Sequence, residues 1–343
     1  MSWNSLEEVA QAMVAPGKGI LAADESTGTI KKRFDSINTE STEENRRSYR
    51  EMLITTPEME DYISGVIMFD ETVRQSTKEG KRFVDELTGK GVIPGIKVDK
   101  GAKDLPFAPG EKVTEGLDGL RARVKEYREM GLRFAKWRAV ITIGDGIPSD
   151  YCIRANAHAL ARYAALCVEG GLVPIVEPEV LMDGSHTIER CSEVTHRTLY
   201  ATFQELALHR VPFEQILLKP NMVLSGSDCS VQAGVDAVAK ATVECFLRTV
   251  PAALPGVVFL SGGQSDELAT QHLNAMNRIY KGRLPWKLSF SYGRALQAPA
   301  LQAWNGKASN LEAGKRAFQH RARLNGAATL GQYSEDMEET AAA

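Results

Sequence analysis

Two lysines of this sequence lie inside short apolar segments rather than among other charged residues. Lys219 lies in QILLKPNM, and Lys136 lies in LRFAKWRAV. A buried charge is costly unless it has a partner or a role. A free lysine amine has a pKa of about 10.4, and desolvation or a neighbouring cation lowers that pKa and exposes the nucleophilic lone pair. An amine activated in this way could attack a ketone and form a Schiff base.

Carboxylates in comparable segments could move protons around such an amine. Glu177 and Glu179 lie in GLVPIVEPEV, and Asp24 lies in GKGILAADES. A carboxylic acid beside the attacked carbon can protonate the departing hydroxyl group, which is general acid catalysis. We expect Glu177 and Glu179 to point in different directions, so that one faces the amine and the other pairs with a cation or turns outward. Asp24 could hold or deprotonate a substrate hydroxyl.

Two further sets of residues could bind anionic groups. The first set combines small residues, which let backbone N–H groups approach a phosphate, with a bidentate donor; it comprises Ser261, Gly262, Gly263, Ser291, Gly293 and Arg294. The second set lies earlier in the chain and comprises Ser26, Thr29, Arg33, Arg46, Lys97 and Arg138. The SGG string is also common in loops for turn geometry, and Arg46 could equally lie on a solvated helix face.

Eight apolar segments that end in polar residues carry these groups: GKGILAADES, ISGVIMFDET, VIPGIKVDKG, LRFAKWRAV, GLVPIVEPEV, QILLKPNM, GVVFLSGGQ and KLSFSYGRA. They recur roughly every 30–45 residues, as strand–helix units do. Each is typical of a buried parallel strand, and the intervening stretches have helical spacing. The pattern predicts an α/β fold, a single-domain (β/α)8 TIM barrel over residues 1–343, whose active site lies at the C-terminal ends of the strands. A doubly wound open sheet is the alternative, but ILAADESTG is not the Gly-rich fingerprint of that fold.

The start of one helix can be placed from its capping residues. The segment STEENRRSYREML begins with Ser41, which is followed three residues later by Glu44. This Ser-x-x-Glu pattern is a capping box, and it predicts that Ser41 caps the helix.

Composition and charge exclude several partners. The 343 residues carry a net charge of −3 and no cluster of basic residues, which argues against nucleic acid. A basic amphipathic helix and an apolar run long enough for a bilayer are both missing from the sequence, so no membrane partner is expected. The five cysteines are widely spaced without a CxxC pair, which indicates reduced thiols and a cytoplasmic protein; a processed plastid protein would show the same pattern. None of the six histidines lies at a predicted strand end, so neither a metal nor another cofactor is expected.

The order and spacing of several strings closely resemble the class I fructose-bisphosphate aldolase family, from about Val9 to Gly331. The strings are GILAADESTG, STEENRR, GIKVDKG, FAKWR, VPIVEPE, LLKPNMV, TVP, FLSGGQS and SFSYGRALQA. The resemblance implies reversible cleavage of fructose 1,6-bisphosphate to dihydroxyacetone phosphate and glyceraldehyde 3-phosphate in glycolysis and gluconeogenesis. It also implies a metal-independent homotetramer with a sugar phosphate as its small-molecule partner.

The resemblance also implies a role for each matching residue. Lys219 corresponds to the Schiff-base lysine, Glu177 to the principal proton-transfer residue with Glu179 supporting it, Asp24 to the residue that handles the C4 hydroxyl, and Lys136 to the lysine beside the reactive amine. The residues implied for the C1 phosphate are Ser261, Gly262, Gly263, Ser291 and Arg294. Those implied for the C6 phosphate are Ser26, Arg33 and Lys97.

The C-terminus departs from the family pattern. Members commonly end in a flexible tail that closes on a tyrosine, whereas this chain ends in EDMEETAAA and its last tyrosine is Tyr333. The residues after about Leu330 are acidic and alanine-rich, with nothing apolar enough to dock firmly, so we expect a mobile tail from about residue 331. The departure leaves open which group exchanges the proton of the bound triose phosphate.

Overall fold

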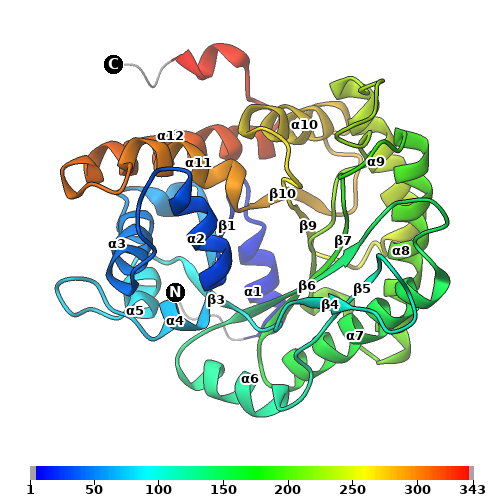
Figure 1. The fold of residues 1–343 in the computed structure, drawn as a ribbon, viewed down its shortest axis with the longest axis horizontal. Helices are drawn as coiled ribbons and strands as arrows, with labels where there is room; N and C mark the ends of the chain where they lie inside the picture. The colour runs from blue at the N-terminus through cyan, green and yellow to red at the C-terminus, as the bar shows by residue number, and fades with distance from the viewer. Residues whose placement is uncertain (1–4, 340–343) are drawn as a thin grey trace.

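A closed barrel of parallel strands forms the centre of the protein, in a computed structural model that describes residues 5–339 (Figure 1). Neighbouring strands follow the order β1-β10-β9-β8-β7-β6-β3-β2, and β2 also pairs with β1, which closes the ring. The eight barrel strands are β1 Gly19–Ala23, β2 Ile63–Met68, β3 Ile93–Lys97, β6 Phe134–Ile141, β7 Val173–Val180, β8 Leu217–Leu218, β9 Gly256–Phe259 and β10 Lys287–Tyr292. The predicted (β/α)8 barrel is confirmed, and closure of the ring excludes the open sheet.

Helices surround the barrel on the outside, as Figure 1 shows. Those of the described part are α1 Leu6–Met13, α2 Thr27–Asp35, α3 Glu43–Ile54, α4 Asp70–Val73, α5 Phe83–Gly89, α6 Leu120–Glu129, α7 Asp150–Glu169, α8 Ile188–Leu208, α9 Val235–Thr249, α10 Asp266–Ile279, α11 Arg294–Trp304 and α12 Leu311–Thr329. A short antiparallel hairpin, β4 Ala102–Asp104 and β5 Lys112–Thr114, lies outside the barrel. None of the helices is both long and apolar enough to cross a membrane.

The barrel interior is filled by side chains from every second position of the strands. The buried cluster inside includes Ile20, Phe134, Ile175 and Leu217, and residues of α1 pack against it at one end. A Cβ at Gly95 would lie 2.3 Å from the Phe134 ring, so glycine makes room for this aromatic side chain. Because side chains alternate between the two faces of a strand, the positions two residues further along each strand also point inward.

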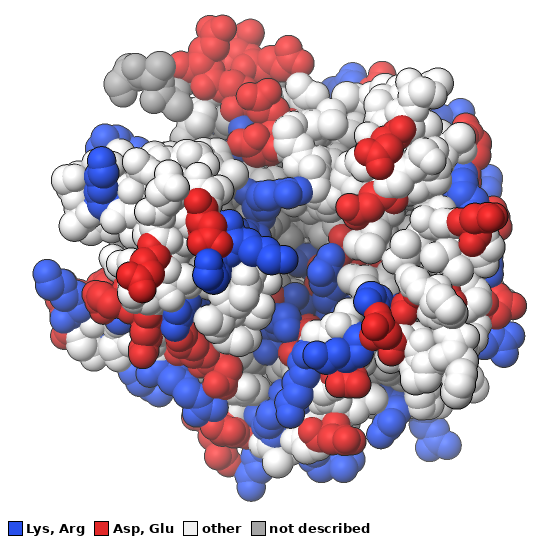
Figure 2. Space-filling model, viewed as in Figure 1, with Lys and Arg blue, Asp and Glu red and all other residues white. Residues whose placement is uncertain are grey.

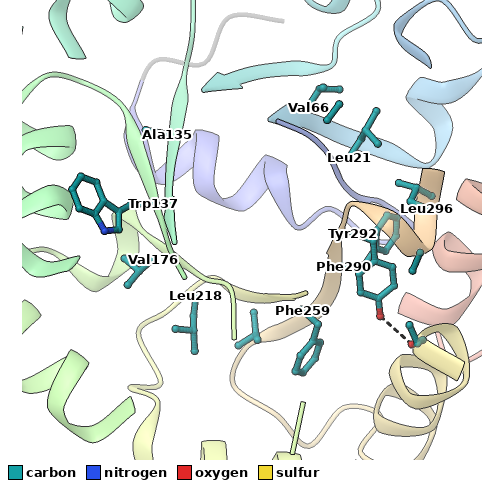
Figure 3. Close-up of a cluster of buried hydrophobic side chains, with 14 of the residues drawn as sticks. Leu21, Val66, Ala135, Trp137, Val176, Leu218, Phe259, Phe290, Tyr292 and Leu296 are labelled. Atoms are coloured by element: carbon teal, nitrogen blue, oxygen red, sulfur yellow. Dashed lines mark hydrogen bonds between the residues drawn. The ribbon is translucent and has the colours of Figure 1, made fainter. Parts of the chain in front are cut away.

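The intervening strand positions point outward and pack beneath the helices. Figure 3 shows members of this larger cluster, among them Leu21, Trp137, Val176 and Phe259. Another member, Tyr292, is fully buried, and its hydroxyl donates a 2.9 Å hydrogen bond to the Ala269 carbonyl of α10. Burial of both strand faces explains why the segments read as continuous apolar runs.

The capping prediction at Ser41 was wrong by one residue. Helix α3 begins at Glu43, and its N-cap is Thr42, whose hydroxyl accepts a 3.1 Å hydrogen bond from the backbone N–H of Asn45. Thr42 is itself a good capping residue, so two adjacent residues of STEEN could have begun the helix. The Ser41 carbonyl instead accepts a 2.6 Å hydrogen bond from Arg46.

The segment after Leu330 packs against the barrel's outer helices, so the expectation that it contains nothing apolar enough to dock was wrong. The Tyr333 side chain is 7% exposed and belongs to the outer cluster, against which Met337 also packs. Glu338 forms a 2.8 Å ion pair with the buried Arg321 of α12. Residues 340–343 lie outside the described part, and mobility of the tail remains a prediction.

Candidate active site

The side chains of four ionisable residues meet at the C-terminal end of the barrel. On each strand they occupy the next inward-facing position after the apolar residues of the barrel interior. Lys136 and Glu177 follow the interior residues Phe134 and Ile175 by two positions, and Lys219 follows Leu217 in the same way. Lys136 and Glu177 lie on the adjacent strands β6 and β7, and Lys219 comes directly after β8, the next strand around the ring. Asp24 follows β1, which lies farther around the barrel from β6. The predicted catalytic residues therefore converge.

Glu177 lies between the two lysines, at nearly equal distances from both. One carboxylate oxygen is 3.3 Å from Lys219 Nζ, and the other, Oε2, is 3.4 Å from Lys136 Nζ. The Lys136 ammonium group also lies 2.6 Å from Asp24. Lys219, Glu177 and Lys136 are each at most 4% exposed. Two lysines and two acidic residues thus form a compact cluster, in which all but Asp24 are buried.

The charges in the cluster fix its protonation. Burial alone would raise the pKa of Asp24, but the ammonium groups of Lys136 and Lys219 outweigh it and lower that pKa to about 2. Burial alone would lower the pKa of Lys136, but the carboxylates of Asp24 and Glu177 outweigh it and raise that pKa above its usual value. At neutral pH, Asp24 is therefore a carboxylate and Lys136 an ammonium group.

Glu179 has a different partner from Glu177, although both belong to β7. It pairs with Arg138 of β6. The two glutamates share the inward face, as residues two apart in a strand do, so the expectation that they point in different directions was wrong. What separates them is height along the barrel, because Glu179 lies one interior layer nearer the open end. One glutamate does face the amine, and the other pairs with a cation as expected.

The first anion-binding set lies together after β9 and β10. Gly262 and Gly263 both have positive φ angles, of 60° and 96°, which glycine adopts without strain. A Cβ at Gly263 would lie 3.0 Å from the Arg294 guanidinium group, so this arginine extends over the glycine loop. The hydroxyl of Ser291 is buried without a hydrogen-bond partner among the described residues. An orphaned hydroxyl and an exposed guanidinium group beside a glycine loop suit an incoming phosphate.

The second set is held by carboxylates. Arg46 makes two hydrogen bonds to Glu71, of 2.8 and 2.5 Å. Arg33 lies 2.5 Å from Glu25. Ser26 and Thr29 hydrogen-bond to each other at 3.1 Å, and Lys97 pairs with Asp99 at 2.6 Å. Gly293 of the first set lies next to this second set, because a Cβ added to it would be 3.6 Å from the Arg33 guanidinium group. The cations of this set are therefore already paired within the chain.

A hollow at the barrel mouth connects several of these groups. It has a volume of about 660 Å³, and its lining includes Ser26, Lys97 and Arg138. Figure 2 shows lysine and arginine side chains around the hollow at the centre of this face. Such a rim attracts an anionic ligand towards the mouth of the barrel.

Sequence reasoning missed the buried pair of Glu25 and Arg50. Arg50 is 1% exposed, donates a 2.7 Å hydrogen bond to the Glu25 carbonyl, and lies 3.4 Å from Glu71. Glu25 in turn holds Arg33. The available signal was the spacing of Arg46 and Arg50, four residues apart on one helix face, which ties α3 to the loop after β1.

Histidines do not contribute to the mouth cluster in the described residues. One group of three residues in this part of the chain could hold a metal ion, namely His158 of α7, Glu205 of α8 and His209, which caps the C-terminus of α8 on the outside of the barrel. His272 is buried on α10. The absence of a metal cofactor stays a prediction.

The fold is a (β/α)8 barrel, and its relatives identify the class of protein as a lyase. A family model described as fructose-bisphosphate aldolase class-I matches residues 5–343. The probable fructose-bisphosphate aldolase class 1 of Xanthomonas axonopodis pv. citri (strain 306) is 60% identical over 334 residues, which cover 97% of this chain and 99% of the relative. Fructose-bisphosphate aldolase 4, cytosolic, of Arabidopsis thaliana is 58% identical and covers 94% of this chain and 82% of its own.

A solved structure of fructose-bisphosphate aldolase from Plasmodium falciparum, in complex with TRAP and a small-molecule inhibitor, superposes with a TM-score of 0.94. It is 50% identical and covers 96% of this chain and 95% of the other. The chain belongs to the class I fructose-bisphosphate aldolase family. It has the activity of that family, a fructose-bisphosphate aldolase of glycolysis.

Proposed function

We propose that Lys219 is the nucleophile that forms a Schiff base with the C2 ketone of fructose 1,6-bisphosphate. The observation that carries the proposal is the position of its amine, buried at the barrel mouth and 3.3 Å from Glu177. Because Glu177 is within reach of the Lys219 amine, its carboxylate can take the proton that Lys219 must lose before it attacks. The Lys136 ammonium group touches the same carboxylate.

Glu177 then returns that proton to the carbinolamine hydroxyl, which leaves as water and gives the iminium. Its Oε2 atom is buried and makes no hydrogen bond among the described residues, so it can accept one from the intermediate. Glu179 and Arg138 support this step by fixing the upper layer of β6 and β7 through their ion pair.

Asp24 and Lys136 act on the far side of the substrate. As the C3–C4 bond breaks, its electron pair moves into the iminium to give an enamine, and the C4 hydroxyl loses its proton to Asp24. A carboxylate with a pKa of about 2 is a weak base, so the substrate hydroxyl must first displace the Lys136 ammonium group from it. The displaced ammonium group then stabilises the developing negative charge.

Two phosphate contacts hold the substrate across the mouth. Ser261, Gly262, Gly263, Ser291 and Arg294 take the C1 phosphate. Ser26, Arg33, Arg46 and Lys97 take the C6 phosphate. Because the second group is already paired with carboxylates, binding there requires those pairs to rearrange. Remote phosphate binding of this kind orients the ketone against the amine.

Borohydride trapping tests the proposed nucleophile. Reduction in the presence of dihydroxyacetone phosphate, followed by peptide mapping, should place the adduct on Lys219. The Lys219→Met variant should fold and form no adduct. Lys287→Met is the matched control, because Lys287 is exposed at the opposite end of the barrel strand β10, and it should label normally. An adduct on Lys97 or Lys136 in the wild-type protein would overturn the mechanism.

We also propose that the protein is a cytoplasmic homotetramer. Two relatives from plants are named as cytosolic or cytoplasmic forms, and all five cysteines are free. Large apolar side chains are exposed on α7 and α8, including Tyr151, Tyr200 and Leu208, as subunit contacts require. Sedimentation equilibrium should give four chains per particle, and Tyr200→Glu should shift it towards smaller species. A monomer at micromolar concentration would refute the assembly.

A further inference from the structure

The glycine loop after β9 is held by a pair of buried side chains that the proposed mechanism does not use. Gln264 is 5% exposed and donates a 2.9 Å hydrogen bond from its side-chain amide to the Ser261 carbonyl. The backbone N–H of Gln264 donates to the same carbonyl at 3.1 Å. Two hydrogen bonds to one oxygen thus close the turn that contains Gly262 and Gly263.

The second member of the pair, His272 on α10, orients this glutamine. Its Nδ1 lies 2.6 Å from the side-chain carbonyl oxygen of Gln264, and its Nε2 is buried without a hydrogen-bond partner among the described residues. The side-chain nitrogen of Gln264 donates to Ser261, so the atom that faces His272 is the side-chain carbonyl oxygen. This oxygen can only accept a hydrogen bond, so Nδ1 of His272 carries the proton. Burial lowers the pKa of His272 to about 4, so the ring adds no charge beside the loop at neutral pH.

The chain from His272 to Gln264 to Ser261 joins helix α10 to the loop that faces Arg294. Helix α10 lies beside β10 (Figure 1). The two elements are joined by the hydrogen bond from Tyr292 to Ala269. The loop needs such a connection because its two glycines with positive φ angles have the greatest backbone freedom of any residue. A loop that donates backbone N–H groups to a phosphate is effective only when those groups are already aimed.

We propose that Gln264 and His272 are positioning residues that fix the Ser261–Gly263 loop in the conformation that binds the C1 phosphate. The inference rests on the proposed placement of that phosphate. Neither residue touches the substrate. Each acts through the backbone of Ser261, so its effect falls on phosphorylated ligands and spares the chemistry at Lys219.

Schiff-base trapping with two ligands tests the inference. Dihydroxyacetone phosphate depends on the loop, whereas dihydroxyacetone presents the same ketone without a phosphate. In Gln264→Met, the concentration of dihydroxyacetone phosphate that gives half-maximal borohydride adduct should rise roughly tenfold, the value of one hydrogen bond to a charged or aligned group. The corresponding concentration of dihydroxyacetone should not change. For fructose 1,6-bisphosphate, KM should rise more than kcat falls.

Three further variants separate positioning from general damage. His272→Leu removes the Nδ1 donor and should reproduce the Gln264→Met result, whereas His272→Asn keeps a donor near the Nδ1 position and should restore most of the affinity. Gln271→Met is the matched control: this glutamine lies on the same helix and hydrogen-bonds to Glu335 instead of the loop, so its trapping curves should match the wild type. If a single variant fails to fold, the double variant Gln264→Met/His272→Leu leaves neither partner unpaired and takes its place.

The outcomes distinguish this inference from the proposed function. An equal loss for both ligands, or no loss for either, overturns the positioning role when Arg294→Ala still weakens trapping of dihydroxyacetone phosphate. If Arg294→Ala and Gln264→Met both leave that trapping unchanged, the phosphate does not bind at this loop, and the proposed C1 site fails together with the inference. A full loss in His272→Asn, equal to that in His272→Leu, would exclude the hydrogen bond as the cause.

Discussion

Replacement of Asp24 by Asn should destabilise the protein in a pH-dependent way. The Asp24 carboxylate lies 2.6 Å from the Lys136 ammonium group, and its pKa falls from 3.8 to about 2 in the folded protein. At about 1.36 kcal/mol per pKa unit, this difference corresponds to about 2 kcal/mol of stability at neutral pH. The amide of Asn cannot provide it, because it carries no charge to pair with Lys136.

The sign of the pH dependence follows from the lowered pKa. The stabilisation is fully present above about pH 4, where Asp24 is ionised in the unfolded chain as well, and is lost as the pH falls towards 2. At pH 3 about half of it, about 1 kcal/mol, has been lost. The difference in unfolding free energy between the wild type and Asp24→Asn should therefore shrink between pH 7 and pH 3.

Urea unfolding followed by tryptophan fluorescence at pH 7, 5, 4 and 3 measures this difference. Asp35→Asn is the matched control, because Asp35 pairs with Lys31 at 2.8 Å on an exposed helix surface, and the change should cost at most about 0.5 kcal/mol. The same Asp24→Asn protein should form the dihydroxyacetone phosphate adduct but cleave fructose 1,6-bisphosphate about 10²–10⁴-fold more slowly. Equal stability of wild type and Asp24→Asn at pH 7, or a difference that does not change down to pH 3, would refute the reasoning.

Three further predictions concern phosphate binding, metal dependence and the tail. Arg294→Ala should raise the KM for fructose 1,6-bisphosphate about ten- to a hundredfold, since a charge-assisted contact contributes about 1.5–3 kcal/mol; an unchanged KM in steady-state assays would place the phosphate elsewhere. EDTA should leave cleavage intact, because the iminium already accepts the electron pair, and a loss of activity that zinc restores would contradict the Schiff-base mechanism. Removal of residues 332–343 should leave Schiff-base formation and tritium exchange on bound dihydroxyacetone phosphate unchanged, because the Tyr333 hydroxyl is bound to Glu338 at 2.8 Å; slower exchange would assign the proton transfer to the tail. The truncation should nevertheless lower the melting temperature, because it leaves Arg321 buried without Glu338.

The sequence alone predicted the barrel and the strand that carries each charged group. The apolar run and the polar residue that ends it are local patterns, so both can be recognised in the sequence without knowledge of the fold. The same runs placed Lys136, Glu177 and Lys219 at strand ends. That each of these side chains faces the barrel interior, two residues beyond an interior apolar residue, followed only from the structure. The resemblance of these strings to an enzyme family then identified the chemistry.

Local patterns were less informative where neighbouring residues had similar propensities. Ser41 and Thr42 are both good capping residues, and the choice between them depended on the path of the chain before α3. The prediction that the residues after Leu330 cannot dock was wrong for a related reason. The composition of this segment is acidic, but its single aromatic residue, Tyr333, packs into the outer hydrophobic cluster, and its carbonyl accepts a hydrogen bond from Asn274 of α10. The composition of a segment does not show whether residues distant in the sequence form a surface for it.

Tertiary structure alone decided which charges are paired. The strand order places Asp24 against Lys136 and Arg138 against Glu179. It also determines that the arginines of the second phosphate set are held by carboxylates while Arg294 is free of ion pairs in the described part of the chain. Coulomb interactions fall with distance and grow with burial, and both depend on which strands and layers become neighbours when the ring closes. The sequence therefore determined the groups available for chemistry, and the closed barrel set their charges and their partners.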